Sequence, residues 1–205
     1  TTGFTGQRKD ASGIWSAGQD FSFGLPLHGD GFPLNSREGE TSFFKYQFSL
    51  ERRQALPGKV EVLVRTSGQL TPDKLVPQEE LFIGGASNVR GYPDNDYGAD
   101  QGIVSTLEFK VPLYLIPEAI IFPKDTQPLQ NRVRVLTFFD HGYGRLRHPS
   151  ERELRTRNFR GIGAGFEVRL WEHVLARLEW GAPLGDEPLT ESSESQFHFR
   201  ILSEI

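Results

Sequence analysis

The stretch Leu81–Tyr92, LFIGGASNVRGY, is the most informative part of the sequence. A short apolar run ends there at two consecutive glycines, which let the backbone turn with positive φ. The polar loop that follows ends in Val89, Arg90, Gly91 and Tyr92. An arginine guanidinium is well suited to a bidentate pair with a carboxylate. The stretch therefore predicts acidic partners for Arg90 elsewhere in the chain.

Composition restricts the classes of protein to which the chain can belong. It has 205 residues, a net charge of −4 with acids and bases mixed along its length, and no cysteine. The length fits one domain, the charge pattern gives no nucleic-acid footprint, and disulfides and thiolate metal sites are excluded. No run of about 18 apolar residues exists, so no transmembrane helix is expected. Transmembrane β-strands stay possible, because they need only about 9–11 residues of alternating polarity.

Alternation of apolar and polar residues is the dominant pattern of the chain. A period of two predicts strands that have one apolar and one polar face. Sixteen phenylalanines, 22 glycines and no methionine also favour strands over helices. The alternation occurs in eight segments, at residues 21–27, 44–51, 59–66, 103–111, 133–140, 161–170, 174–180 and 197–201.

A soluble sandwich and a membrane barrel would both alternate in this way. Two features favour the barrel. The apolar face is almost entirely Phe, Val, Leu and Ile, with tryptophans and tyrosines near the strand ends, and the polar face carries nearly balanced charges that would suit a polar lumen. We therefore expect an all-β fold, a transmembrane antiparallel up-and-down β-barrel of eight strands. It would span residues 13–205 and follow a polar N-terminal lead at residues 1–12.

Several motifs resemble those of the bacterial surface-antigen superfamily, which includes the BamA-type insertases, TamA and the two-partner-secretion transporters such as FhaC. In that family a Val-Arg-Gly-Phe/Tyr tip follows a Phe-x-x-Gly-Gly strand end; here the tip at Val89–Tyr92 follows Gly84 and Gly85, with Leu81 at the position of the family phenylalanine. The family strand after this loop carries an inward glutamate, which Glu108 matches. A Phe-x-Asp-x-Gly strand of the family is matched by Phe138, Asp140 and Gly142.

The resemblance implies a lock in which Arg90 pairs with Glu108 and Asp140 and holds the long loop at residues 70–102 against the lumen. By strand parity, Glu108, Phe138 and Asp140 all lie on the polar face, as such a lock requires. The same parity follows from the alternation alone and does not depend on the motif.

A glycine ladder resembles the next strand of the family and consists of Gly161, Gly163 and Gly165. Glycine on an inner face leaves room for another backbone or for a loop. The family barrel has sixteen strands behind periplasmic repeats, whereas only its last eight strands are recognised here. Since an eight-stranded barrel is filled by its own side chains, the loop would cap its mouth or the sheet would associate with a second copy. We expect a small closed barrel that forms a homodimer.

The resemblance implies insertion of proteins into the outer membrane of a Gram-negative bacterium, or translocation across it, with outer-membrane lipid around the barrel and an unknown protein substrate. The alternative is a passive barrel, either an anchor or a small pore, in which the lock only stabilises the fold. No enzyme, cofactor or metal site is expected, because the histidines lack metal-ligand spacing and no nucleophile elbow accompanies them. Five arginines of the expected outer loops are candidates for contact with lipopolysaccharide phosphates, with a solvated loop as the simpler alternative: Arg145, Arg147, Arg152, Arg155 and Arg157.

Overall fold

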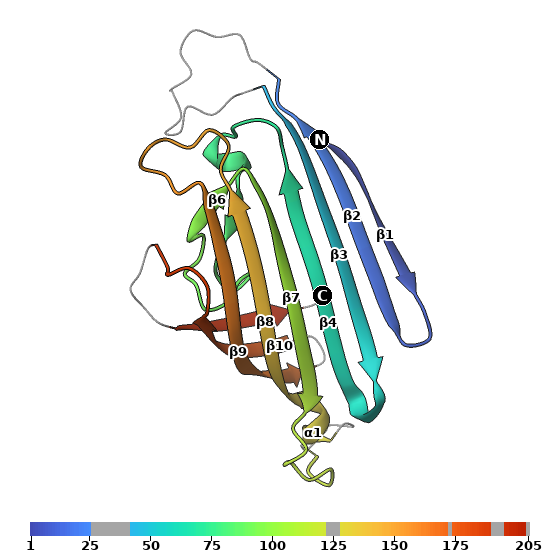
Figure 1. Cartoon of the computed structure of the whole chain (residues 1–205). Helices are drawn as coiled ribbons and strands as arrows, with labels where there is room; N and C mark the ends of the chain where they lie inside the picture. The colour runs from blue at the N-terminus through green and yellow to red at the C-terminus, as the bar shows by residue number, and fades with distance from the viewer. Residues whose placement is uncertain (26–41, 122–127, 172–173, 190–194, 204–205) are drawn as a thin grey trace.

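The computed structural model describes residues 1–25, 42–121, 128–171, 174–189 and 195–203. Nine antiparallel strands form one sheet in the order of the chain, and a small hairpin of two strands lies between the fourth and fifth of them (Figure 1). The sheet consists of β1 (Thr2–Lys9), β2 (Gly13–Phe23), β3 (Phe44–Leu56), β4 (Val60–Leu70), β7 (Gln101–Pro112), β8 (Val133–Arg145), β9 (Thr156–Trp171), β10 (Val174–Pro183) and β11 (Gln196–Ser203). The hairpin consists of β5 (Leu81–Ile83) and β6 (Tyr97–Ala99), and the short helices are η1 (Pro57–Lys59), η2 (Pro77–Glu79) and α1 (Leu129–Arg132).

The expected number of eight strands is wrong, because the residues taken for a polar lead form a ninth strand. All of β1 pairs with β2, from Thr2 opposite Phe21 to Lys9 opposite Ile14. The turn between them is closed by Asp10, whose Oδ1 accepts hydrogen bonds from the backbone N–H groups that follow it. A hydrogen bond from Arg52 also holds the pKa of Asp10 below its ordinary value. Every side chain of β1 is exposed, so the strand has no buried face that would impose alternation.

The expected closure of the sheet into a barrel is also not confirmed. Within the described residues β1 and β11 are the two edges of the sheet, and no pairing joins them. The sheet curls, so that β10 passes behind β8 and β9 (Figure 1). The segment between β4 and β7 explains why eight strands do not close tightly. It packs against the sheet through β5 and β6, and an eight-stranded barrel leaves no interior space for it.

The two faces of the sheet have opposite chemistry. The inner face, defined here as the face against which the segment between β4 and β7 packs, carries polar and charged side chains that are buried: Lys45, Gln69, Thr106, Glu108, Asp140, Glu167 and Glu179. The outer face carries large apolar side chains that are more than one third exposed, among them Leu50, Val64, Leu107, Phe109, Phe139, Ile162, Phe166, Leu178 and Trp180. This is the reverse of a soluble domain and matches the lipid-facing and lumen-facing sides of a membrane barrel.

An apolar core lies between the inner face and the segment at residues 71–100, which we call the β4–β7 segment. Its members come from this segment and from β7, β9 and the connection after β8: Ile83, Val89, Tyr92, Tyr97, Ala99, Val104, Leu146 and Phe159. The core therefore attaches the β4–β7 segment to the inner face of the sheet. No helix in the described ranges is long and apolar enough to cross a membrane.

Candidate functional site

A tight loop in the β4–β7 segment presents Arg90 to the inner face. Gly84 and Gly85 have φ values of 114° and 99°, which side-chain-bearing residues rarely adopt. The loop is closed by Asn88, whose Oδ1 accepts a hydrogen bond from the Gly84 N–H at 2.8 Å, and by a bond from the Gly85 N–H to the Val89 carbonyl at 3.1 Å. The two glycines that end the apolar run therefore turn the chain back towards the sheet.

The Arg90 guanidinium is buried and bound on three sides. It is 4% exposed. Its Nε and Nη2 donate to the two carboxylate oxygens of Asp140 at 2.7 and 2.9 Å, and its backbone N–H donates to the same carboxylate at 3.1 Å. Its Nη1 donates to Glu108 at 2.6 Å and to Glu179 at 2.5 Å. The guanidinium carbon lies 3.5 Å from the centre of the Phe138 ring, within the range of a cation–π contact.

The acids come from three strands, which makes the site a junction between one loop and a large part of the sheet. Glu108 lies on β7, Asp140 on β8 and Glu179 on β10. The register of β7 and β8 sets Glu108 opposite Phe138 and places Asp140 two residues further along the same face. We call Arg90, Glu108, Asp140 and Glu179 the Arg90 cluster. The sequence places Glu108 and Asp140 on one face as expected partners of Arg90, and the structure brings all three into direct contact.

Glu179 is a partner of Arg90 that the sequence does not predict. Its parity puts it on the polar face, but no motif distinguishes it from the other charged residues there. Only the curl of the sheet brings β10 towards Arg90, whose position lies 89 residues earlier in the chain. A contact between such distant positions depends on strand number and curvature, which the alternation pattern does not specify.

Further cations balance the acids of the cluster. Arg177 donates to Glu108 at 2.6 Å and to Glu179 at 2.9 Å, and Arg200 donates to Glu179 at 2.6 Å. Lys110 lies 3.7 Å from Glu108 and donates to Glu167, a further acid of the inner face, at 2.8 Å. Asp140 differs from the other acids, because Arg90 is its only ion-pair partner within the described residues. Asp140 therefore depends on Arg90 for its compensating charge, whereas Glu108 also has Arg177, and Glu179 also has Arg177 and Arg200.

Only one glycine of the ladder faces the loop backbone. A Cβ at Gly161 would lie 2.0 Å from the carbonyl oxygen of Arg90. A Cβ at Gly163 would instead meet the Phe138 ring and the β10 backbone, and one at Gly165 would meet the β10 backbone near Glu179. The backbone of the loop thus occupies the space beside Gly161 that the sequence predicts. Gly163 and Gly165 instead allow close approach of Phe138 and of β10.

The remaining motif residues pack the loop tip. Val89 is fully buried, and a Cβ at Gly142 would lie 2.9 Å from its Cγ2. Gly91 has a φ of 98° and lies against the backbone of β10 at Ala182. Tyr92 is also fully buried, its ring meets Phe159 edge-on at 4.9 Å, and its hydroxyl accepts a hydrogen bond from a backbone N–H after β10. Each residue of the tip therefore has a packing reason for its identity.

Two buried aspartates tie the β4–β7 segment to neighbouring loops. Asp100 accepts hydrogen bonds from the backbone N–H groups of Leu75 at 2.8 Å and Arg147 at 2.6 Å. Asp96 accepts from Arg157 at 3.1 Å and from the backbone N–H of Leu189 at 2.8 Å. Arg157 is itself buried, so its expected role as a lipopolysaccharide contact is wrong.

Replacing Asp100 with alanine is expected to loosen the ends of the β4–β7 segment. The change leaves two backbone donors without their acceptor, at a cost of roughly 1–3 kcal/mol when the donor is buried. Hydrogen exchange measured by mass spectrometry should rise at Leu75 and Arg147. Asp73→Ala is the matched control, because its carboxylate accepts an exposed backbone bond from Phe44. Equal exchange in the two variants would contradict a special role for Asp100.

The ion pairs of the Arg90 cluster are expected to resist salt. At about 1 M salt the screening length falls to roughly 3 Å, which weakens exposed pairs but not buried ones. Protease cleavage within residues 71–100 should therefore proceed at the same rate at low and high sodium chloride. The turn at Asp10 serves as the internal control, because its pair with Arg52 is partly exposed and should loosen. Faster cleavage at both places would mean that the cluster is open to solvent.

Comparisons with known proteins agree with this architecture. The family model of haemolysin secretion/activation protein ShlB/FhaC/HecB matches residues 1–168. The heme/hemopexin transporter protein HuxB of Haemophilus influenzae is 22% identical over 167 residues, which is 80% of this chain and 27% of that protein. HuxB of another strain is 24% identical over 112 residues, covering 55% and 18% of the two chains.

A solved structure also resembles this chain. CdiB from Escherichia coli matches with a TM-score of 0.70 at 20% identity, covering 98% of this chain and 35% of CdiB. That likeness concerns the fold. The chain spans about a quarter or less of the length of the curated relatives that it matches. Within the described residues, no group of three or more His, Asp or Glu side chains could hold a metal ion. The match over most of its length places the chain in the haemolysin secretion/activation protein family, ShlB/FhaC/HecB.

Proposed function

We propose that this chain forms part of the wall of an outer-membrane β-barrel that moves a protein substrate across the outer membrane of a Gram-negative bacterium. The family, a group of secretion proteins by its description, supports this assignment. The apolar outer face and the charged inner face support a sheet that separates lipid from a polar interior. Of the two activities that the surface-antigen resemblance implies, the family favours translocation over insertion.

The observation that carries the proposal is the burial of Arg90 against acids from three strands. The Arg90 cluster holds the β4–β7 segment on the inner face, where the segment occupies space that a passing polypeptide needs. Removing one partner of a buried ion pair is strongly destabilising, so the held position is the resting one. In this proposal Arg90 acts as the fastening of a movable segment, and substrate passage requires the segment to shift.

A passive barrel is the second candidate, with the Arg90 cluster serving stability alone. The inner face favours an anchor over a pore, because the β4–β7 segment and the balanced ion pairs fill the space beside β7 to β10. A wide pore would give a large and steady conductance in a planar bilayer. The transporter and the anchor are separated by whether the segment must move.

The open edges of the sheet require partners if the sheet lies in lipid, because unpaired backbone groups are not tolerated there. These partners are further strands of the same protein or a second copy of the chain, which would be the expected homodimer. The mass of the detergent-solubilised particle, measured by light scattering, separates the two. A particle with one copy would contradict the homodimer, and one with two copies would support it.

A reversible crosslink tests whether the segment must move. The chain has no cysteine, and the contact between Val89 and the Cβ position of Gly142 brings their β-carbons within the span of a disulfide. In the Val89→Cys/Gly142→Cys variant, the disulfide should hold the segment closed. Proteins released into the culture medium are compared by mass spectrometry among cells without the protein, with wild type and with the variant. We expect at least one protein to be missing from the medium of cells without this chain and to be present again with wild type. With the double cysteine variant it should be present only after mild reduction of the disulfide.

The two single cysteine variants are the controls, since they carry the same changes in packing without the crosslink. If deletion of this chain removes no protein from the culture medium, the chain forms a passive barrel. If the oxidised double variant restores release as well as wild type does, the segment does not have to move and the fastening role is wrong.

A further inference from the structure

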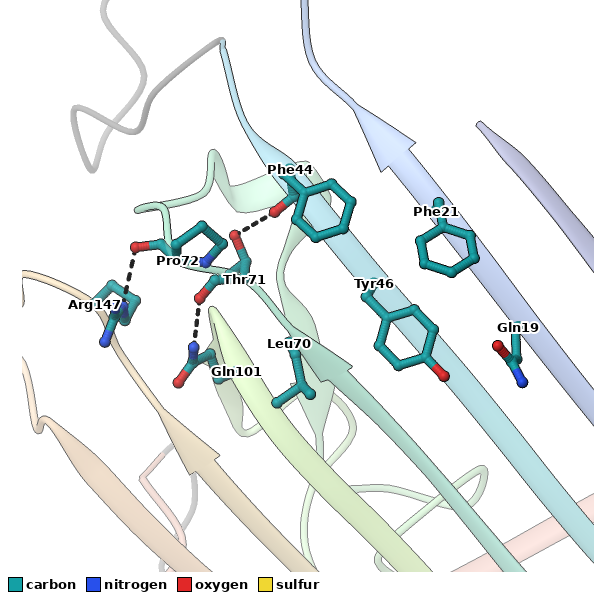
Figure 2. A pocket seen from close by; sticks show the side chains of 9 residues that line it. All are labelled: Gln19, Phe21, Phe44, Tyr46, Leu70, Thr71, Pro72, Gln101 and Arg147. Atoms are coloured by element: carbon teal, nitrogen blue, oxygen red, sulfur yellow. Dashed lines mark hydrogen bonds between the residues drawn. The ribbon is translucent and has the colours of Figure 1, made fainter.

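A groove lies on the outer face of the sheet, at the end where β4 enters the β4–β7 segment (Figure 2). Its volume is about 590 Å³. The groove lies on the opposite face of the sheet from the Arg90 cluster, and the function proposed above makes no use of it. Its lining combines an apolar floor, built from three strands, with a polar rim from two loops and the first residue of β7.

The floor of the groove is a row of apolar side chains across β2, β3 and β4. Strand register places Phe21 opposite Tyr46 and Tyr46 opposite Leu70. The Phe21 ring lies 5.0 Å from the Tyr46 ring and 6.4 Å from the Phe44 ring, measured between centroids. Leu70 is 51% exposed, so the row has no cover in the described part of the chain. The floor is continuous with the apolar outer face below it, which includes Leu50 and Val64.

The rim of the groove is polar and held by hydrogen bonds. Thr71 donates to the Phe44 carbonyl at 2.7 Å, and Gln101 donates to the Thr71 carbonyl. Arg147 is anchored twice, because its backbone N–H binds buried Asp100 and its Nε donates to the Pro72 carbonyl at 3.1 Å. Figure 2 shows Thr71 and Pro72 between the rings and Arg147. The rim is therefore preorganised around one guanidinium.

The terminal nitrogens of Arg147 are the unused donors of this rim. Among the described residues, neither Nη1 nor Nη2 makes a hydrogen bond, and no carboxylate forms an ion pair with this guanidinium. Two acids near the groove already accept backbone N–H groups: Asp73 from Phe44, and Asp100 from Leu75 and Arg147. Two parallel N–H donors of a guanidinium match the oxygens of a phosphate. The groove thus offers a phosphate contact at one end and an aromatic surface at the other.

We propose that this groove binds one anionic phosphate-bearing lipid of the surrounding bilayer, with its phosphate on Arg147 and an acyl chain over Phe21, Phe44 and Tyr46. The proposal rests on the proposed function in one respect, that the outer face of the sheet contacts lipid. Aromatic side chains gather at the interface between hydrocarbon and headgroups, which is where a floor of rings beneath an arginine places them. Charge complementarity and the continuity of the floor with the apolar face select a lipid over a soluble anion.

Native mass spectrometry of the detergent-purified protein tests this with phosphatidylglycerol and phosphatidylcholine as probes. We expect one phosphatidylglycerol to stay bound at concentrations where phosphatidylcholine does not. Arg147→Gln should weaken that binding by about fivefold or more, as the loss of a charge-assisted bidentate contact implies. Phe21→Ser changes the floor without touching the rim and should weaken it as well. Arg152→Gln, at an exposed arginine of the same loop, is the matched control and should bind as wild type.

Three outcomes would overturn the lipid site. Equal retention of the two lipids would mean a non-specific lipid belt, and unchanged binding in Arg147→Gln would remove the phosphate contact. Competition by glycerol 3-phosphate at equal concentration would mean a site for a soluble phosphate. The oxidised Val89→Cys/Gly142→Cys variant separates this proposal from the transport function, because it holds the β4–β7 segment, and with it the rim at Thr71 and Pro72, in place: it should stop protein release while leaving the bound phosphatidylglycerol.

Discussion

Replacing Arg90 with alanine is expected to release the β4–β7 segment from the sheet and to lower the free energy of unfolding by about 3–5 kcal/mol, the usual cost of removing one partner of a buried ion pair. The cost falls mainly on Asp140, which would be left buried without a cation, whereas Glu108 and Glu179 keep Arg177. Protease cleavage within residues 71–100 should become rapid, and the barrel should melt at a lower temperature. Both are measured on the detergent-purified protein.

Arg65→Ala is the matched control for this change. Arg65 also reaches the β4–β7 segment, by a bond of 3.2 Å to the Ser87 carbonyl, but its side chain is exposed. Its loss should therefore change cleavage and melting little. Arg90→Ala combined with Asp140→Asn should cost less than the two single changes added together, because the double variant leaves no unpaired charge. Unchanged cleavage and melting in Arg90→Ala would remove the basis for a fastened segment.

Charge conservation is not sufficient at this position. Lysine in place of Arg90 keeps the positive charge but loses the planar fork that binds both oxygens of Asp140. The Arg90→Lys variant should therefore fall between alanine and wild type in melting temperature and in cleavage rate. A wild-type result would mean that the position needs a cation of any shape.

The sequence predicts which side chains lie on each face of the sheet much better than it predicts the number of strands or the closure of the sheet. Alternation works for β9 and β10 because a buried inner face forces Glu167 and Glu179 to one side and exposed Phe166 and Leu178 to the other. It fails for β1, where neither face is buried and the side chains are free to vary. The aspartate at position 10 is the feature of the sequence that could have indicated β1, since its carboxylate accepts two backbone N–H groups and closes the hairpin between β1 and β2.

The members of the Arg90 cluster likewise differ in whether the sequence predicts them. Glu108 and Asp140 could be predicted because they lie on adjacent strands at fixed motif spacing, and the register of β7 and β8 then brings them together. Glu179 and the anchoring aspartates, Asp96 and Asp100, depend on how far the sheet curls and on where the long segment meets the loops. These are properties of three-dimensional packing over long sequence separations, which local periodicity does not encode.

Adding one methyl group at Gly161 is expected to disrupt the Arg90 cluster, as removal of a charge does, although the substitution removes no charged group. The Cβ of an alanine there would lie 2.0 Å from the Arg90 carbonyl oxygen, a distance at which the backbone of the loop has to move. Overpacking of this kind costs about 1–3 kcal/mol, and here the displaced atoms belong to the residue that carries the guanidinium. Gly161→Ala should therefore speed cleavage within residues 71–100 and lower the melting temperature.

Gly6→Ala is the matched control, since a Cβ at that glycine of β1 meets nothing within 4 Å. It should melt as wild type does. The combination of Gly161→Ala with Arg90→Ala tests the mechanism. If the methyl group acts by pushing Arg90 off Asp140, the double variant should be no less stable than Arg90→Ala alone, because the ion pair can be lost only once. Full additivity would mean that Gly161 supports the sheet independently of the loop, and the close approach of the two backbones would then have no part in fastening the segment.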